Sequence, residues 1–288
     1  NWNTRDLLAA CLLSLAAPDG MPDGTEVIVV DNGSSDDSVA YLREHAQWVR
    51  LIAQSVNNGF AAATNVGLSV ARGEHLLLLN SDTEACPGAL TAMVAHLRRH
   101  PEVGVVGADV RNPDGSAQPC RGRAPSIVTE TFSILGLDRR FRMFAAGRYR
   151  QPRAGIYLPC AWVLGAALMV RRATYAAIGP LDEGYFMYSE EIDWCARIRA
   201  GGWGVGMLAG ARVIHLGGGS TRRTGDRMRP ALFRSKVRYL ALHQGAPSAH
   251  AFRFVIRMVA ALHVVAARVY GAGRHEEVAS WRAVFQSI

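Results

Sequence analysis

The five cysteines of this 288-residue chain form no pattern that is typical of a disulfide framework or a metal site. Their number is odd, they are widely scattered, and no CxxC pair occurs. A disulfide framework and a cysteine zinc site both depend on recognisable spacings, so neither is indicated. We expect reduced thiols, as in a cytosolic protein. The positions are Cys11, Cys86, Cys120, Cys160 and Cys195.

Several motifs that carry common chemistry are also missing. No GxGxxG follows an early strand, which disfavours a dinucleotide-binding oxidoreductase. No GxSxG motif or Cys/His arrangement supports a hydrolase. The glycine-rich stretch 217–221 lacks the GxxxxGK[ST] frame of a phosphate-binding loop, because no lysine occurs before Lys236. We interpret this stretch as a mobile loop that closes over a diphosphate, with Arg222 and Arg223 adding positive charge.

Long apolar runs without charge are absent as well. A membrane-spanning helix needs ~20 mostly apolar residues. The most apolar stretch near the C-terminus, 254–270, is interrupted by Arg257, His263 and Arg268, so it is a poor candidate for a span. The chain begins on Asn1 rather than Met, and we expect an apolar strand to precede this residue.

Charge is distributed unevenly along the chain, whose formal net charge is +8. Residues 1–100 carry a net charge of −5, residues 101–220 carry +4, and residues 221–288 carry +9. A nucleic-acid-binding protein would be expected to be basic on its main domain. An acidic N-terminal third with a basic C-terminal segment fits anionic lipid headgroups or an anionic lipid-linked substrate better.

The first half of the chain alternates between strand and helix patterns. Strands followed by helices over ~110 residues predict a parallel α/β sheet. Ligands of such sheets bind at the carboxyl ends of the strands, and both Asp31 and Asp82 lie at such ends. The predicted strands are 26–30, 49–52, 75–79 and 103–108, and the predicted helices are 36–44, 60–71 and 87–100.

The second half is less regular up to residue 160. Strands are predicted over 165–170, 205–208 and 212–216, and helices over 171–178 and 190–200, the latter closed by two glycines. From residue 228 onward the pattern is helical. Apolar residues of this tail recur at helical spacing, which fits a helix packed on the catalytic domain, while Arg253 and Arg257 beside them fit a helix lying on a membrane. Both interpretations stay open for Phe252, Val255, Ile256, Val259 and Leu262.

Six residues combine into a constellation that suits metal-assisted group transfer. Hard oxygen ligands with one imidazole are typical of Mg²⁺ or Mn²⁺ sites. Such a metal bridges a diphosphate and neutralises the charge that grows on a departing nucleoside diphosphate, while another carboxylate takes a proton from an attacking hydroxyl. The residues are Asp31, Asp82, Glu190, Glu191, Asp193 and His215.

Each of these residues also has a structural alternative. Asp31 could cap the following helix, Asp82 could be a turn residue, and His215 could be a structural histidine after a strand. Glu190 and Glu191 could complement a helix dipole. Asp193 and Arg197 have the i,i+4 spacing of a helix ion pair. A contact of these residues with substrate is an equal alternative.

Six segments, in this order, resemble the family 2 glycosyltransferases of the GT-A fold, in particular their bacterial rhamnosyltransferase-like branch. The resemblance extends over about residues 1–225. The segments are Asn1-Trp2-Asn3-Thr4; Val29 to Asp36 with Asp31-Asn32-Gly33; Asn58-Gly59-Phe60 to Asn65-Val66-Gly67; Leu78-Leu79-Asn80-Ser81-Asp82-Thr83; Gly184 to Asp193 with Arg197; and Val213-Ile214-His215-Leu216 before Gly218 to Thr221.

The resemblance implies roles for individual residues. Asn3 and Asp31 would contact the nucleoside, and Asn58 and Asn65 would line the donor pocket. The segment Asn80-Ser81-Asp82 stands where the family has its DxD motif; its first position is Asn, so Asp82 would hold the metal while Asn80 and Ser81 face the donor. His215 aligns with a histidine that binds metal or donor phosphate. Glu191 stands where the family commonly has the Asp proposed as general base, and Glu190 is the neighbouring alternative.

Together these observations predict an inverting glycosyltransferase with a mixed, mostly parallel GT-A-type sheet over 1–225 and a basic helical extension over 226–288. The resemblance implies Mg²⁺ or Mn²⁺ as cofactor, dTDP-L-rhamnose as leading donor, and a lipid-linked glycan or cell-wall precursor as acceptor. A transferase that uses a UDP-sugar such as UDP-galactofuranose and a non-catalytic nucleotide-sugar-binding scaffold are the alternatives. We expect a cytoplasmic protein at the inner face of the membrane, with no nucleic-acid partner. Residues 109–165 are expected to choose the sugar.

Overall fold

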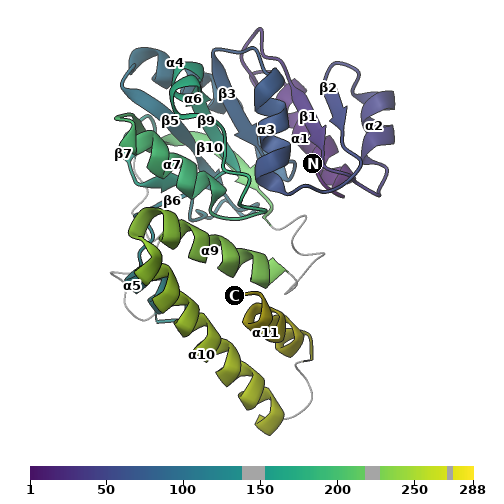
Figure 1. Ribbon diagram of the computed structural model, residues 1–288. Coiled ribbons are helices and arrows are strands. Elements are labelled where there is room, and N and C mark those ends of the chain that lie inside the picture. The colour runs from purple at the N-terminus through teal and green to yellow at the C-terminus, as the bar shows by residue number, and fades with distance from the viewer. Residues whose placement is uncertain (138–152, 218–227, 271–274) are drawn as a thin grey trace.

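The computed structural model describes residues 1–137, 153–217, 228–270 and 275–288. Its chain forms an α/β domain and, below it in Figure 1, a group of helices that contains the C-terminus. The predicted glycine-rich loop with Arg222 and Arg223 lies, apart from Gly217, outside the described residues.

The central sheet has six strands in the order β3-β9-β5-β10-β4, with β7 also paired to β10. Parallel pairing joins β5 to β10, whereas β9 pairs antiparallel with both β3 and β5, and β4 and β7 pair antiparallel with β10. The strands are β3 (His75–Leu79), β4 (Thr83–Ala85), β5 (Val103–Arg111), β7 (Tyr157–Pro159), β9 (Ala167–Arg171) and β10 (Gly204–His215).

This sheet is mixed, as predicted, but its pairs are mainly antiparallel rather than parallel. The reason lies in β9, which inserts between β3 and β5 after a long excursion of the chain and runs opposite to both. Smaller two-stranded sheets are formed by β1 (Ile28–Asp31) with β2 (Arg50–Ala53), which are parallel, and by β6 (Arg121–Gly122) with β8 (Trp162–Val163).

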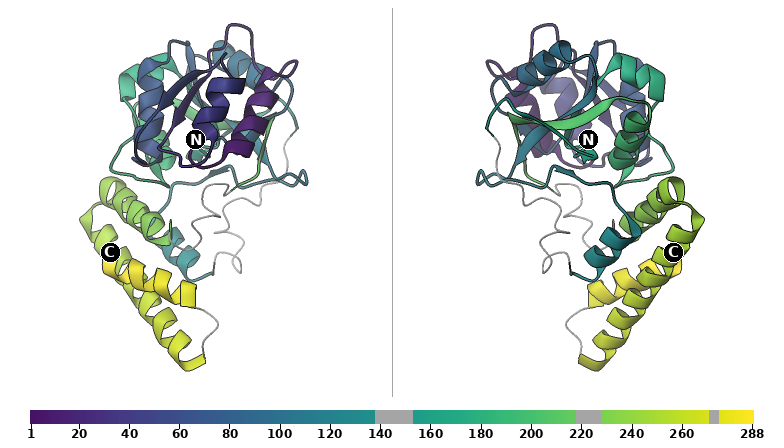
Figure 2. Two further views of the ribbon diagram at one scale, coloured as in Figure 1. Left: turned by 90° about the vertical axis from the view of Figure 1, so that its right-hand side faces the viewer. Right: turned by 90° about the vertical axis from the view of Figure 1, so that its left-hand side faces the viewer.

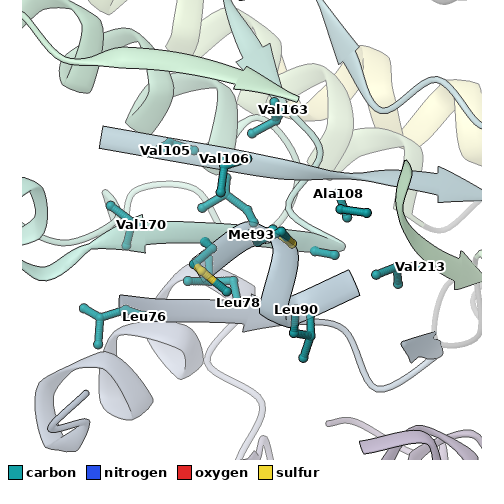
Figure 3. Packing of buried hydrophobic residues seen from close by; sticks show 14 of the residues in the cluster. Leu76, Leu78, Leu90, Met93, Val105, Val106, Ala108, Val163, Val170 and Val213 are labelled. Carbon is teal, nitrogen blue, oxygen red and sulfur yellow. The ribbon is translucent and has the colours of Figure 1, made fainter. Parts of the chain in front are cut away.

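Helices cover the sheet and close the main core. Strand β5 is buried along its whole length, which is typical of a strand with helices or loops on both faces. Figure 3 shows how side chains of β3, β5 and β9 pack with those of α4. The helices of this part are α1 (Arg5–Ala16), α2 (Ser38–His45), α3 (Phe60–Val70), α4 (Ala89–Arg99), α6 (Arg172–Ile178) and α7 (Glu190–Ala200).

Residues 204–215 form one strand where two were predicted. Gly210 lies in this strand with φ +85°, and the pairing with β5 shifts register between Met207 and Arg212. A left-handed glycine accommodates such a bulge without strain from a side chain. The strand therefore continues through the predicted break.

A second apolar core belongs to the helical group, which contains α9 (Arg229–Gln244), α10 (Ala246–Tyr270) and α11 (His275–Ser287). It also includes α5 (Ile127–Ile134), which comes from within the region predicted as catalytic. Two views at right angles to Figure 1 show this group projecting from the α/β domain (Figure 2). The division at residues 225 and 226 stays a prediction.

The tail helix packs, as one of the two predicted alternatives required, but mainly on the other helices of its own group, α9, α11 and α5, rather than on the α/β domain. Phe252, Ile256 and Val259 are buried in the second core, and Val255 packs against it. Leu262 does not pack in this core, because its side chain is 63% exposed. The five apolar residues are spread over a wide part of the helix surface. The sequence alone does not show which of them the neighbouring helices cover.

Candidate functional site

A chain of hydrogen bonds connects the end of β1 with the segment that follows β3. The Nδ2 group of Asn1 donates to Asp31 Oδ1 at 2.8 Å, and Thr4 Oγ1 donates to Asn1 Oδ1 at 2.7 Å. Thr4 Oγ1 is also 3.0 Å from Ser81 Oγ. The structure thus brings two of the predicted donor-site residues, Asp31 and Ser81, into one polar network.

Asp31 is fully buried and organises the loop after β1. Besides Asn1, its carboxylate accepts hydrogen bonds from the Ser34 main-chain N–H at 2.9 Å and from Ser34 Oγ at 2.6 Å. Asn3, with φ +53°, reaches the same loop, because its Oδ1 accepts from the N–H of Ser35 at 2.7 Å. The side chains of Asn3 and Asp31 therefore fix a loop whose backbone can approach a ligand.

The loop before α3 is held by Asn32, a residue that the sequence analysis did not assign to the site. Asn32 is buried; its Nδ2 donates to Asn57 Oδ1 and Gly59 O, each at 3.0 Å. Its Oδ1 accepts from the Asn58 N–H at 3.0 Å, which leaves the Asn58 side chain on the exposed surface. Only long-range contacts reveal this role of Asn32.

Asn65 lies on α3 and faces the segment before α7. Its Oδ1 accepts from the Leu181 N–H at 3.0 Å, and its Nδ2 donates to Leu181 O and to Glu183 Oε1, both at 2.9 Å. The side-chain amide is thereby engaged within the protein. Asn65 positions residues 181–183. Asn65 would therefore affect a donor pocket indirectly, by holding this segment in place.

Asp82 and His215 face each other where β4 and β10 pair. His215 Nε2 is 3.2 Å from Asp82 Oδ1, and both side chains are nearly buried. The main chains are joined as well, because the Leu216 N–H donates to Asp82 O at 3.0 Å. Antiparallel pairing of the two short strand ends thus brings together the two predicted metal ligands, which are 133 positions apart in the sequence.

Gln118 sets the orientation of the His215 ring. Its Nε2 donates to two carbonyl oxygens, Asn112 Oδ1 at 2.7 Å and His215 O, so its Oε1 must be the atom that lies 3.0 Å from His215 Nδ1. An amide oxygen only accepts, so Nδ1 carries the proton. His215 Nε2 then faces Asp82, while the other ring nitrogen is held by a hydrogen bond, a pattern found around metal-binding histidines.

The acid pair Glu190 and Glu191 opens helix α7 and is buried, and Oε2 of each has no hydrogen-bond partner among the described residues. Burial raises the pKa of Glu191 to about 7, against an opposing effect of nearby backbone N–H groups. The pKa of Glu190 is also raised, first by burial and then by the charge of Glu191. A carboxylate with a pKa near neutrality can exchange a proton with a substrate hydroxyl.

The connection between β8 and β9 joins the acid pair to the segment after β3. A Cβ at Gly165 would lie 3.4 Å from the Cβ of Glu191, so the helix start packs closely on this connection. The Asn80 N–H donates to Ala166 O at 2.9 Å. Oδ1 of Asn80 is buried and has no hydrogen-bond partner within residues 1–137, 153–217, 228–270 and 275–288. A buried carbonyl oxygen in that state is available to a ligand.

Helix α7 begins after two consecutive residues in the left-handed region, Tyr188 with φ +71° and Ser189 with φ +68°. Each costs roughly 1–2 kcal/mol for a residue with a side chain, and such strain is characteristic of functional sites. Helix α9 holds the strained turn, since Ser235 Oγ donates to Met187 O at 2.7 Å. The position of the acid pair therefore depends on the helical group.

Two further contacts from α9 hold the same region. Arg238 forms an ion pair with both carboxylate oxygens of Asp182: its Nε donates to Oδ2 at 2.9 Å, and its Nη2 donates to Oδ2 at 2.7 Å and to Oδ1 at 3.0 Å. His243 Nε2 is 2.8 Å from Asp193 Oδ1, while Arg197 Nε donates to Asp193 Oδ2 at 2.8 Å. Of the two alternatives for Asp193 and Arg197, the helix ion pair is present, and a contact with substrate stays a prediction.

Replacing Gly59 tests how tightly the segment before α7 is packed. Gly59 has φ +89°, and a Cβ there would lie 2.5 Å from Phe186 O, the atom that accepts from the Phe60 N–H. Gly88 has φ +75° with nothing within 4 Å of a Cβ. We expect Gly88→Ala to lower the free energy of unfolding by about 1 kcal/mol, and Gly59→Ala to lower it at least twice as much, with loss of activity. Denaturant unfolding of both variants measures this difference, and equal losses would contradict it.

Comparisons with known proteins give one family. The family model described as Glycosyl transferase family 2 matches residues 1–164. A relative from Mycobacterium tuberculosis (strain ATCC 25618 / H37Rv), named N-acetylglucosaminyl-diphospho-decaprenol L-rhamnosyltransferase, is 30% identical over 210 residues, which is 68% of this chain and 68% of the relative. Rhamnosyltransferase WbbL from Escherichia coli (strain K12) is 28% identical over 101 residues, which is 34% of this chain and 38% of the length of WbbL.

A solved structure of similar fold is the mannosyltransferase PcManGT from Pyrobaculum calidifontis in complex with GDP-Man and Mn²⁺. The superposition covers 100% of this chain and 83% of the mannosyltransferase chain, with a TM-score of 0.59 and 16% sequence identity. This likeness supports the GT-A type of fold.

Proposed function

Because this chain belongs to glycosyltransferase family 2, we propose that the polar residues around Asp31, Asp82 and Glu191 bind a nucleotide-sugar donor and transfer its sugar to an acceptor hydroxyl. The chain is a glycosyltransferase. The observation that carries the proposal for the site is the convergence of the Asp82–His215 pair and the buried acid pair on the segment after β3.

The donor would be held by the loops after β1 and β3. Asn3 and Asp31 fix the loop that contacts the nucleoside, and the Asn58 side chain is exposed for contact with the donor. Ser81 belongs to the same hydrogen-bonded network. Oδ1 of Asn80, a buried carbonyl oxygen, can accept a hydrogen bond from the donor, because it accepts none from the described residues. Asn65 would act by holding the segment before α7.

Asp82 and His215 fit a divalent metal. Among the described residues no group of three or more His, Cys, Asp or Glu side chains is arranged to hold an ion, so these two would share it with the diphosphate of the donor. Carboxylate oxygen, imidazole nitrogen and phosphate oxygen suit Mn²⁺ or Mg²⁺. When bound, the metal neutralises charge on the leaving nucleoside diphosphate.

Glu191 would accept the proton of the acceptor hydroxyl as that oxygen attacks the anomeric carbon. Its buried carboxylate has a raised pKa, and its Oε2 atom has no hydrogen-bond partner in the part of the chain that the structure describes. Attack opposite to the leaving diphosphate inverts the anomeric centre, the geometry known from inverting glycosidases. Glu190 is the alternative base.

The named relatives support L-rhamnose as the sugar and a lipid-linked diphosphate glycan as the acceptor. We propose dTDP-L-rhamnose as the donor, with a UDP-sugar such as UDP-galactofuranose as the second candidate. The region expected to choose the sugar, 109–165, includes residues 138–152, which lie outside the described residues.

A screen of nucleotide sugars tests the donor assignment. We expect dTDP-L-rhamnose with Mn²⁺ or Mg²⁺ to raise the melting temperature of the protein, because a ligand that binds only the folded state stabilises it by about 2.7 kcal/mol at 100 times its Kd. Omitting the metal, or adding EDTA, should abolish most of this shift.

Release of dTDP in the presence of an acceptor distinguishes the transferase from a non-catalytic scaffold, which would show the same shift without turnover. A larger shift with UDP-galactofuranose than with dTDP-L-rhamnose would contradict the donor assignment. Full activity after exhaustive EDTA treatment would contradict the metal role of Asp82 and His215.

A further inference from the structure

One face of helix α10 exposes a line of large apolar side chains. The opposite face, which includes Phe252 and Ile256, is fully buried against the other helices of the group. The exposed residues follow one another at spacings of 4, 4 and 3 positions, so they lie on one side of the helix. This set, which we name the α10 stripe, is Phe254 (67% exposed), Met258 (49%), Leu262 (63%) and Val265 (56%).

Positive charge accompanies the stripe. Arg253 and Arg257 are exposed beside Phe254 and Met258, and the sequence of α10 contains no Asp or Glu. The segment 221–288 has a net charge of +9 against −5 for residues 1–100. Two copies of this face meeting about a two-fold axis would bring like-charged arginines together, whereas an anionic surface complements them.

An apolar stripe bordered by arginines is the pattern of a helix that lies in the plane of a membrane surface. Residues 246–265 are long and apolar enough to cross a bilayer by length and composition. However, one face of this helix is occupied by the second core, and two arginines interrupt the other. If α10 lies parallel to the membrane surface, its packed face keeps its contacts with the protein, and its arginines reach lipid headgroups.

We propose that the α10 stripe docks the protein on an anionic lipid bilayer. Phe254, Met258, Leu262 and Val265 enter the boundary between headgroups and acyl chains, and Arg253 and Arg257 contact lipid phosphates. Helix α9 connects this surface to the site, because it packs on α10 and holds Met187, Asp182 and Asp193. Docking brings the acid pair to a lipid-linked acceptor; this last step rests on the proposed function, whereas the binding to lipid does not.

Co-sedimentation of the full chain with vesicles tests the proposal in the absence of donor and acceptor. We expect binding to vesicles of equal parts phosphatidylglycerol and phosphatidylcholine, and binding at least tenfold weaker to phosphatidylcholine alone or in 0.5 M salt. Phe254→Ser should weaken binding about tenfold, and Arg253→Glu with Arg257→Glu at least tenfold.

Two controls match these variants. Leu13→Ser removes a side chain that is 68% exposed on α1, and Arg98→Glu with Arg99→Glu reverses the same number of charges on α4. Both should bind vesicles as the parent protein does. Since all replaced side chains are exposed, circular dichroism should show intact folding.

Three results would overturn the proposal: no binding to anionic vesicles by the parent protein, equal loss in the controls and the α10 variants, or a dimer that Phe254→Ser dissociates while vesicle binding is unchanged. Normal sugar transfer to a water-soluble acceptor by the α10 variants, together with lost vesicle binding, would leave the proposed function intact and support the docking role.

Discussion

Asp82→Ala should reduce kcat by roughly 10³-fold while the protein stays folded. Removing this carboxylate would deprive the metal of one of two protein ligands, and a metal that stabilises a leaving diphosphate lowers the activation free energy by several kcal/mol. The fold should persist, because the hydrogen bond from the Leu216 N–H to residue 82 uses only the main chain, and Gln118 still holds the His215 ring.

The matched measurement is the Mn²⁺-dependent shift in melting temperature with a nucleoside diphosphate. Asp82→Ala should lose most of that shift, whereas Glu44→Gln, which removes a carboxylate from the exposed end of α2, should keep both the shift and the turnover. Near-normal turnover in Asp82→Ala would remove Asp82 from the metal site.

Elements with a strong local signal could be predicted from the sequence. The strand 75–79 and the helix 190–200 have the predicted bounds, because a run of four leucines and a helix closed by two glycines leave little choice. The positions of Asp31 and Asp82 near strand ends could be predicted in the same way, since Asp31 is the last residue of β1 and Asp82 lies three positions after the end of β3. Their assignment to the site stays a prediction.

The rest depends on contacts between distant parts of the chain. Gln118 reaches His215 across 97 positions, and His243 reaches Asp193 across 50, and neither residue stands in a motif. The sequence analysis predicted no helix or strand over residues 5–16, whereas the structure has helix α1 there, packed against β4. The antiparallel insertion of β9 likewise follows from strand pairing and not from the period of its own sequence.

Glu191→Gln should abolish turnover and, at the same time, stabilise the fold at alkaline pH. A general base contributes typically 10²–10⁴-fold to the rate, and Gln cannot accept the proton, so we expect kcat to fall by roughly 10³-fold. For the parent enzyme, kcat/KM should rise with pH and level off above about 7, the pKa of Glu191, because the base must be ionised in the free enzyme.

The sign of the stability effect follows from the raised pKa. Below pH 4.5, the ordinary value for Glu, the folded and unfolded states both hold the proton. Between 4.5 and about 7 only the unfolded state releases it, so the parent protein loses stability as pH rises through this window. Gln is neutral throughout. Glu191→Gln should therefore unfold like the parent at pH 4.5 and be more stable by roughly 1–3 kcal/mol at pH 8.

Glu190→Gln separates the base from its neighbour. Glu190 is also buried with a raised pKa, so its replacement should stabilise the fold at pH 8 in the same sense. If Glu191 is the base, Glu190→Gln should retain substantial turnover while Glu191→Gln retains almost none. Denaturant unfolding at pH 4.5 and pH 8, together with transfer rates, gives both quantities for each variant. Loss of turnover in Glu190→Gln alone would transfer the role to Glu190, and a destabilised Glu191→Gln at pH 8 would mean that its carboxylate is ionised and favourably bound in the folded protein.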